Sequence, residues 1–72
     1  MIFVVEVTTD NEGKTAQAVW KKGTVDDAFM QLHQIMASAM ANANVSEAFV
    51  TLLNKCGDTI KHEYWVREVV EG

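Results

Sequence analysis

Three side chains of this sequence are suited to nucleophilic or metal chemistry, namely His33, Cys56 and His62. No two of them stand at the spacing of a ligand pair such as Cys-x-x-Cys or His-x-x-x-His, so a zinc site is not expected. His33 borders an apolar helical stripe, where a boundary histidine needs no catalytic role. Cys56 follows Lys55 in a predicted turn, and no general base is spaced to activate its thiol.

The acidic residues and glycines offer no catalytic pattern either. Asp26 and Asp27 follow Thr24 in a sequence typical of a helix N-terminus, where carboxylates complement the helix dipole. Glu6 and Glu63 fall in predicted strands among polar neighbours. The 4 glycines are isolated from one another, so no phosphate-binding loop is present. We therefore expect a protein that is not an enzyme and that uses no metal or cofactor.

Composition and charge narrow the class of protein further. The 10 acidic and 6 basic residues give a formal net charge of −4, which disfavours nucleic-acid binding. The single cysteine cannot form an intramolecular disulfide, which favours a reducing cytoplasm. The sequence has no apolar run of the ~18 residues that span a membrane. Its apolar start reaches Glu6 without a basic region before it, so a signal peptide is not expected. We expect one cytoplasmic α+β domain over residues 1–72 that binds neither nucleic acid nor membranes.

Hydropathy patterning predicts two strands, a helix and a further strand. Segments 2–8 and 14–21 are rich in β-branched and aromatic residues and flank a turn of Asp, Asn and Gly, which is typical of a β-hairpin. From residue 25 to 40, apolar residues recur every three or four positions, which indicates an amphipathic helix capped by Thr24. Residues 59–70 carry apolar and aromatic residues that predict a long strand, namely Ile60, Tyr64, Trp65, Val66, Val69 and Val70.

Residues 46–56 are ambiguous between a helix and a strand. Ser46 is suited to cap a second helix that would stop at Gly57. The β-favouring Phe-Val-Thr run and the Asn-Lys-Cys-Gly-Asp turn that follows it favour a strand instead. Because the strand over 59–70 needs an antiparallel neighbour, we predict a strand at 47–54. The expected fold is α+β in the order β-β-α-β-β, a four-stranded antiparallel sheet with one helix packed on one face.

A resemblance to known proteins is carried by the helix start and the second hairpin. The residues concerned are Thr24, Asp27, Ala28, Asn54, Gly57, Ile60, Lys61, Glu63, Tyr64 and Trp65. With these residues the chain resembles small uncharacterised proteins of phages and prophages in Gram-positive bacteria. The likeness covers residues 14–67 or so, and its sharpest part is the Glu-Tyr-Trp stretch. It implies a bacterial cytoplasmic setting and a phage origin, and it implies no activity.

The last predicted strand raises the question of which sheet face the helix covers. Strand alternation places Lys61, Glu63 and Arg67 on the same side as Trp65. Three charges in a row are not expected in a core, so this side should be the one that faces away from the helix. Trp65 is then expected on the helix-free face, as the anchor of any contact made there.

The helix-free face is the predicted interaction surface. Its expected members are Trp65, Lys61, Glu63, Arg67, Ile2 and Val4. Tyr64 and Val66 are correspondingly expected beneath the helix. Apolar residues rimmed by charge usually mark a surface that binds a partner. We expect a protein-interaction module that forms a homodimer or small oligomer; the alternative is a phage-type effector that binds and blocks a host protein.

Overall fold

The computed structural model of the chain describes residues 1–68. Its elements, in chain order, are β1 (Ile2–Asp10), β2 (Thr15–Lys22), α1 (Val25–Ala41), β3 (Val45–Asn54) and β4 (Thr59–Val66). The order β-β-α-β-β confirms the predicted α+β fold, and the ambiguous segment is a strand with the turn that follows it. The last strand ends at Val66, earlier than predicted, and residues 69 and 70 lie outside the described residues.

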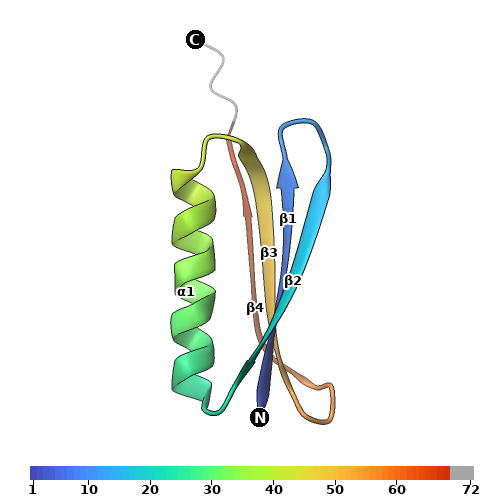
Figure 1. The fold of residues 1–72 in the computed structure, drawn as a ribbon, viewed down its shortest axis with the longest axis vertical. Coiled ribbons are helices and arrows are strands. Elements are labelled where there is room, and N and C mark those ends of the chain that lie inside the picture. Colours follow the sequence, from blue (N-terminus) through green and yellow to red (C-terminus); the bar gives the residue numbers. More distant parts are fainter. Residues whose placement is uncertain (69–72) are drawn as a thin grey trace.

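The strands form one antiparallel sheet of 4 strands in the order β2-β1-β3-β4 (Figure 1). The central strands β1 and β3 pair along most of their length, from Ile2 opposite Asn54 to Thr9 opposite Glu47. The edge strands β2 and β4 each pair with their hairpin partner, β1 and β3 respectively. Helix α1 leads the chain from the outer strand β2 across the sheet to the position of β3 beside β1.

Both hairpin turns combine a glycine with a side-chain acceptor. Gly13 has a φ of 84° and Gly57 a φ of 87°, backbone values that residues with a Cβ rarely adopt. Asp10 in the first turn and Asn54 in the second each accept two backbone N–H bonds through Oδ1, at 2.8 to 3.0 Å. The Asp or Asn and the Gly from which each turn is predicted are therefore the residues that form it.

Helix α1 begins where its capping signal predicts. Thr24 Oγ1 accepts the backbone N–H of Asp27 at 3.1 Å, and Asp26 and Asp27 occupy the first turn. The buried residues of α1 are Ala28, Leu32, Ile35, Met36 and Ala39. Among residues 1–68, no helix has the length and apolarity needed to cross a membrane.

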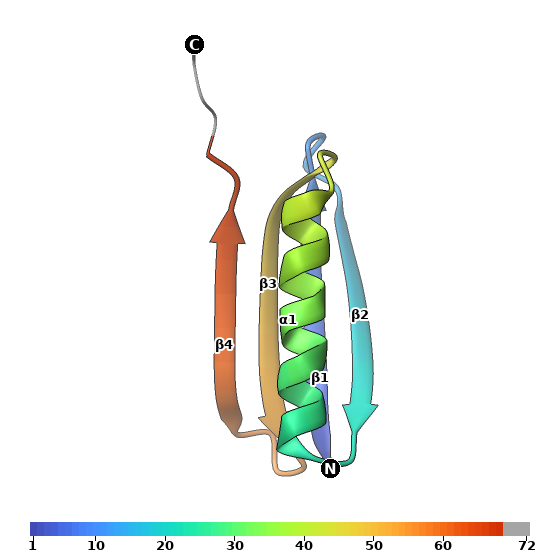
Figure 2. The same ribbon diagram turned by 90° about the vertical axis from the view of Figure 1, so that its left-hand side faces the viewer.

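The core lies between α1 and one face of the sheet. The sheet contributes Ile2, Val4, Ala48, Val50 and Leu52, and Trp20 and Trp65 pack against this cluster. Figure 2 shows α1 running along the central strands, with β2 on one side and β4 on the other. One helix thus covers one face of the sheet, and the two edge strands flank it.

Candidate interaction surface

The structure places Trp65 on the side of the sheet opposite to the one predicted. Trp65 packs against the core on the α1 side, whereas Tyr64 and Val66 are 58% and 53% exposed. Because alternate residues of a strand point to opposite faces, Lys61 and Glu63 lie on the α1 side with Trp65. The prediction that α1 covers Tyr64 and Val66 is therefore wrong.

The position of β4 at the edge of the sheet explains the error. α1 lies over β1 and β3, and β4 lies to one side of the helix (Figure 2). Side chains on the α1 side of β4 can therefore reach water beside the helix. Lys61 and Glu63 meet there in an ion pair with an N–O distance of 3.5 Å and remain exposed. A row of charges on an edge strand therefore does not identify the face that lacks a helix.

Arg67, another member of the predicted surface, closes the C-terminal end of α1. Its Nη2 donates to three carbonyl oxygens at that end of the helix at 3.0 to 3.2 Å, and its Nε donates to the Val45 carbonyl at 3.1 Å. The guanidinium carbon lies 4.8 Å from the centre of the Trp65 ring. Because the last turn of α1 has no basic residue, Arg67 supplies the cation that this end of a helix favours.

The remaining members, Ile2 and Val4, are core residues that are 8% and 0% exposed. Strand alternation grouped the residues on one side of the sheet, but that side is the one α1 packs against. The placement of the predicted set Trp65, Lys61, Glu63, Arg67, Ile2 and Val4 on the helix-free face is therefore wrong. The exposed face of the sheet is the opposite one.

The uncovered side of the sheet, called the open face below, carries a large apolar area. By register and alternation its apolar and aromatic members are Phe3, Val5, Val7, Val19, Phe49, Leu53, Tyr64 and Val66, and its polar members are Thr9, Thr15, Gln17, Lys21, Glu47, Thr51 and His62. Sequence reasoning missed it although a signal was present. Apolar residues run without interruption from residue 2 to 5 and almost so from 48 to 53, a pattern typical of strands covered on both faces.

Aromatic side chains gather on the β3–β4 half of the open face. The ring of Phe49 has its centroid 6.2 Å from that of His62 and 6.4 Å from that of Tyr64. The Tyr64 hydroxyl donates to Glu47 Oε2 at 2.7 Å. This hydrogen bond raises the pKa of Tyr64, with smaller contributions in the same direction from desolvation and from the charge of Glu47. An apolar centre with a polar pair at its rim resembles the layout of a protein interface.

The charges on the open face balance one another. Within β1 to β4 its charged residues are Lys21 at one end of the sheet and Glu47 at the other. The acidic surplus of the chain lies elsewhere, for example at Glu6 on the α1 side and at Asp26 and Asp27 in the first turn of the helix. The open face therefore combines apolar area with no net charge.

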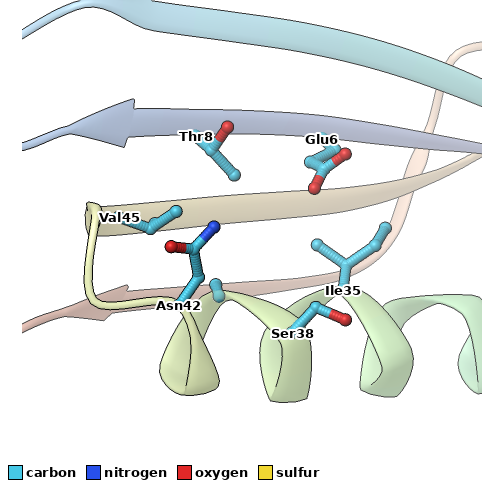
Figure 3. A pocket seen from close by; sticks show the side chains of 7 residues that line it. Glu6, Thr8, Ile35, Ser38, Asn42 and Val45 are labelled. Atoms are coloured by element: carbon cyan, nitrogen blue, oxygen red, sulfur yellow. The ribbon is translucent and has the colours of Figure 1, made fainter.

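A small hollow lies on the α1 side, between the helix and β1 (Figure 3). Its volume is about 210 Å³, and it is lined by Glu6, Thr8, Ile35, Ser38, Ala39, Asn42 and Val45. Figure 3 shows the Glu6 carboxylate extending from β1 toward the helix, and partial burial raises the pKa of this carboxyl. Glu6 is the one titratable group among the lining residues, so the hollow does not offer the second acid or base that a catalytic pair needs.

The residues with nucleophilic or metal-binding chemistry lie on three separate elements. His33 is on α1, Cys56 is exposed in the β3–β4 turn, and His62 is on β4. Within the described part of the chain, no three His, Cys, Asp or Glu residues are placed to hold a metal ion. These residues therefore do not form a common site.

Comparison with known proteins identifies no relative of this chain. No family model, curated protein or solved structure matches the chain significantly. The resemblance to phage and prophage proteins stays a prediction.

Proposed function

We propose that this protein is an interaction module that binds a second copy of itself through the open face. The observation that carries the proposal is the apolar character of β1 and β3 on both sides, although α1 covers one side only. An antiparallel sheet with one wet face ordinarily alternates apolar and polar residues. Phe3, Val5, Val7 and Phe49 break that rule on the uncovered side, which favours a state in which this side is covered.

The area of the open face is sufficient for a dimer. With 4 strands ~4.8 Å apart and about eight residues of ~3.3 Å each, the face measures on the order of 500 Å² per copy. Two such faces in contact remove about 1,000 Å² from water, which reaches the lower limit for a specific interface. Two sheets stacked face to face at about 10 Å are also a common packing arrangement.

The charge of the open face favours a second copy over a strongly charged partner. Lys21 and Glu47 cancel each other on this face, while the whole chain carries a formal charge of −4. Two copies that meet elsewhere would bring like charges together, whereas two open faces would not. A twofold contact also uses the same apolar surface on both copies.

The variant Phe49→Lys tests the proposal. Phe49 lies on a central strand and is 38% exposed, so a lysine there reaches water in the monomer but is buried without a partner in the dimer. We expect self-association, measured by sedimentation velocity over a hundredfold concentration range, to weaken at least about tenfold. The matched control is Met30→Lys, because Met30 is 60% exposed on α1 and lies outside the open face.

Two results would contradict the proposal. The first is a wild-type chain that stays monomeric over the whole concentration range. The second is an equal effect of Phe49→Lys and Met30→Lys. A monomer whose open face binds a bacterial host protein would favour the effector alternative instead.

The setting we propose is a reducing cytoplasm, since the chain has one cysteine and no disulfide to stabilise it.

A further inference from the structure

The edge strand β2 has one side that is not paired. It pairs with β1 over Thr15–Lys22, and no strand among residues 1–68 pairs with its outer side. The hairpin closes with the Asp10 N–H donating to the Lys14 carbonyl at 2.9 Å, so every second residue of β2 from Ala16 onward bonds to β1. The residues between them direct N–H and C=O away from the sheet: Thr15, Gln17, Val19 and Lys21.

The two edges of the sheet differ in their protection against strand addition. β4 carries the Lys61–Glu63 ion pair near its middle and a register shift in its pairing with β3. Charges and irregular pairing are the devices that keep an edge strand from pairing with other chains. From Thr15 to Trp20, β2 has no charged residue, no proline and no register shift. β2 is therefore the edge better suited to accept another strand.

Lysines at the ends of β2 indicate the charge of a partner. Lys14 precedes the strand and Lys21 and Lys22 end it, with no acidic residue between them. Lys14 lies 3.5 Å from a Glu12 carboxylate oxygen in an exposed pair, so the adjacent Lys21 and Lys22 are the main positive charge for a partner. An antiparallel pair of two β2 strands centred on Ala18 would place Lys14 opposite Lys22, and like charges in that position are destabilising.

We propose that the outer edge of β2 binds an extended acidic segment of another protein as an added β-strand. The outward N–H and C=O groups of Gln17 and Val19 form the backbone pairing. Lys21 and Lys22 select a segment with Asp or Glu at the end that lies beside them. The pairing groups are backbone atoms at the edge of the sheet, so the site does not require self-association, although the side chains of Gln17, Val19 and Lys21 lie on the open face.

A capped peptide of sequence Glu-Glu-Thr-Val-Thr-Val-Thr is the probe, with Lys-Lys-Thr-Val-Thr-Val-Thr as its charge-reversed counterpart. On binding of the acidic peptide, the amides of Gln17 and Val19 become protected from hydrogen exchange, because they gain acceptors that they lack in the free protein. The lysine peptide binds at least about tenfold more weakly, and added salt weakens the acidic peptide.

The variant Gln17→Pro removes one outward N–H and leaves the β1–β2 bonds in place, since proline is tolerated at such edge positions. It lowers the affinity for the acidic peptide at least about tenfold. The matched control Gln17→Thr keeps the N–H and binds as the wild type does. An unchanged ¹H–¹⁵N spectrum outside β2 establishes that the proline variant is folded.

Four results would overturn the proposal: equal binding of the two peptides, unchanged binding by Gln17→Pro, protection at β4 or at the open face instead of β2, and loss of self-association in Gln17→Pro. If Gln17→Thr keeps self-association, the last result would make a second copy of the chain the occupant of this edge. Gln17→Pro removes an N–H at the edge of β2, whereas Phe49→Lys places a charge on a central strand of the open face. Gln17→Thr controls for loss of the Gln17 side chain from that face, so failure of one proposal is distinguishable from failure of the other.

Discussion

Trp65 illustrates how one residue contributes to folding and not to an open surface. Its ring packs against the core beside α1 and lies under the Arg67 guanidinium. We expect Trp65→Ala to lower the free energy of unfolding by about 2–4 kcal/mol, somewhat less than a fully buried tryptophan, because the residue is partly exposed. Urea denaturation measures this loss. Self-association of the folded variant should be unchanged, and weaker association would place Trp65 in the contact after all.

Glu6 gives folding a pH dependence of predictable sign. Burial raises the pKa of its carboxyl above the ordinary value of 4.5, so the folded state holds the proton more tightly than the unfolded state. The contribution of Glu6 to stability is therefore highest below pH 4.5 and is lost as the pH rises through the raised pKa. Glu6→Gln should stabilise the protein at pH 7 by less than about 1 kcal/mol, because water still reaches the carboxylate.

Urea denaturation of Glu6→Gln and of the wild type at pH 7 and at about pH 3.5 measures the effect. All other carboxyl groups are the same in the two proteins, so their contributions cancel in the difference. The stabilisation should disappear at the lower pH, where Glu6 is protonated in both states. A wild type that is more stable than Glu6→Gln at pH 7 would mean that the carboxylate makes a favourable contact in the folded protein.

At the scale of elements, Arg67 ties the end of β4 to the end of α1. Its guanidinium donates to three carbonyls at the C-terminal end of α1 and to the Val45 carbonyl, and it lies over the Trp65 ring. Arg67→Ala should lower the free energy of unfolding by about 1–3 kcal/mol, since hydrogen bonds to a charged group are lost at a helix end. Arg67→Lys should recover only part of this, because an ammonium cannot reproduce the planar fork. Full recovery in the urea midpoint would reduce the role of Arg67 to its charge alone.

Elements whose signals are local could be predicted from the sequence. Gly13 and Gly57 adopt the positive φ that their turns require, and Thr24 caps α1 with its own side chain. The covered face of β4 could not be predicted in this way, because it depends on the strand order β2-β1-β3-β4. That order makes β4 an edge, where Lys61 and Glu63 can lie on the helix side and still reach water.

The open face was missed for a related reason. Alternation separates two faces only when one of them is polar, and β1 from Ile2 to Val5 is apolar on both. Long-range pairing then decides which set the helix covers, and Ile2 and Val4 are the residues that it covers. The apolar residues on both sides of β1, which make the assignment of faces ambiguous, are also the observation on which the proposed dimer rests.

At the scale of the whole molecule, a chain of 72 residues has little interior to stabilise it. Domains of this size bury only about 60% of the surface of the unfolded chain. One helix and one sheet face make a single core layer, and the second sheet face contributes nothing to it until another surface covers it. Two open faces in contact would create a second apolar layer of comparable width, so folding and association should be thermodynamically linked.

This linkage predicts that the melting temperature rises with protein concentration. For a folded dimer and an unfolded monomer, a hundredfold rise in concentration stabilises the dimer by about 2.7 kcal/mol. Because the two chains of 72 residues unfold together, this corresponds to an upward shift of about 5–10 °C in the melting midpoint. Calorimetry on the wild type should show the shift and Phe49→Lys should show much less of it, because a buried lysine opposes the contact. The contrary result is a wild-type midpoint that does not move at concentrations where sedimentation detects the dimer. It would mean that association is not linked to folding and that the second apolar layer does not stabilise the fold.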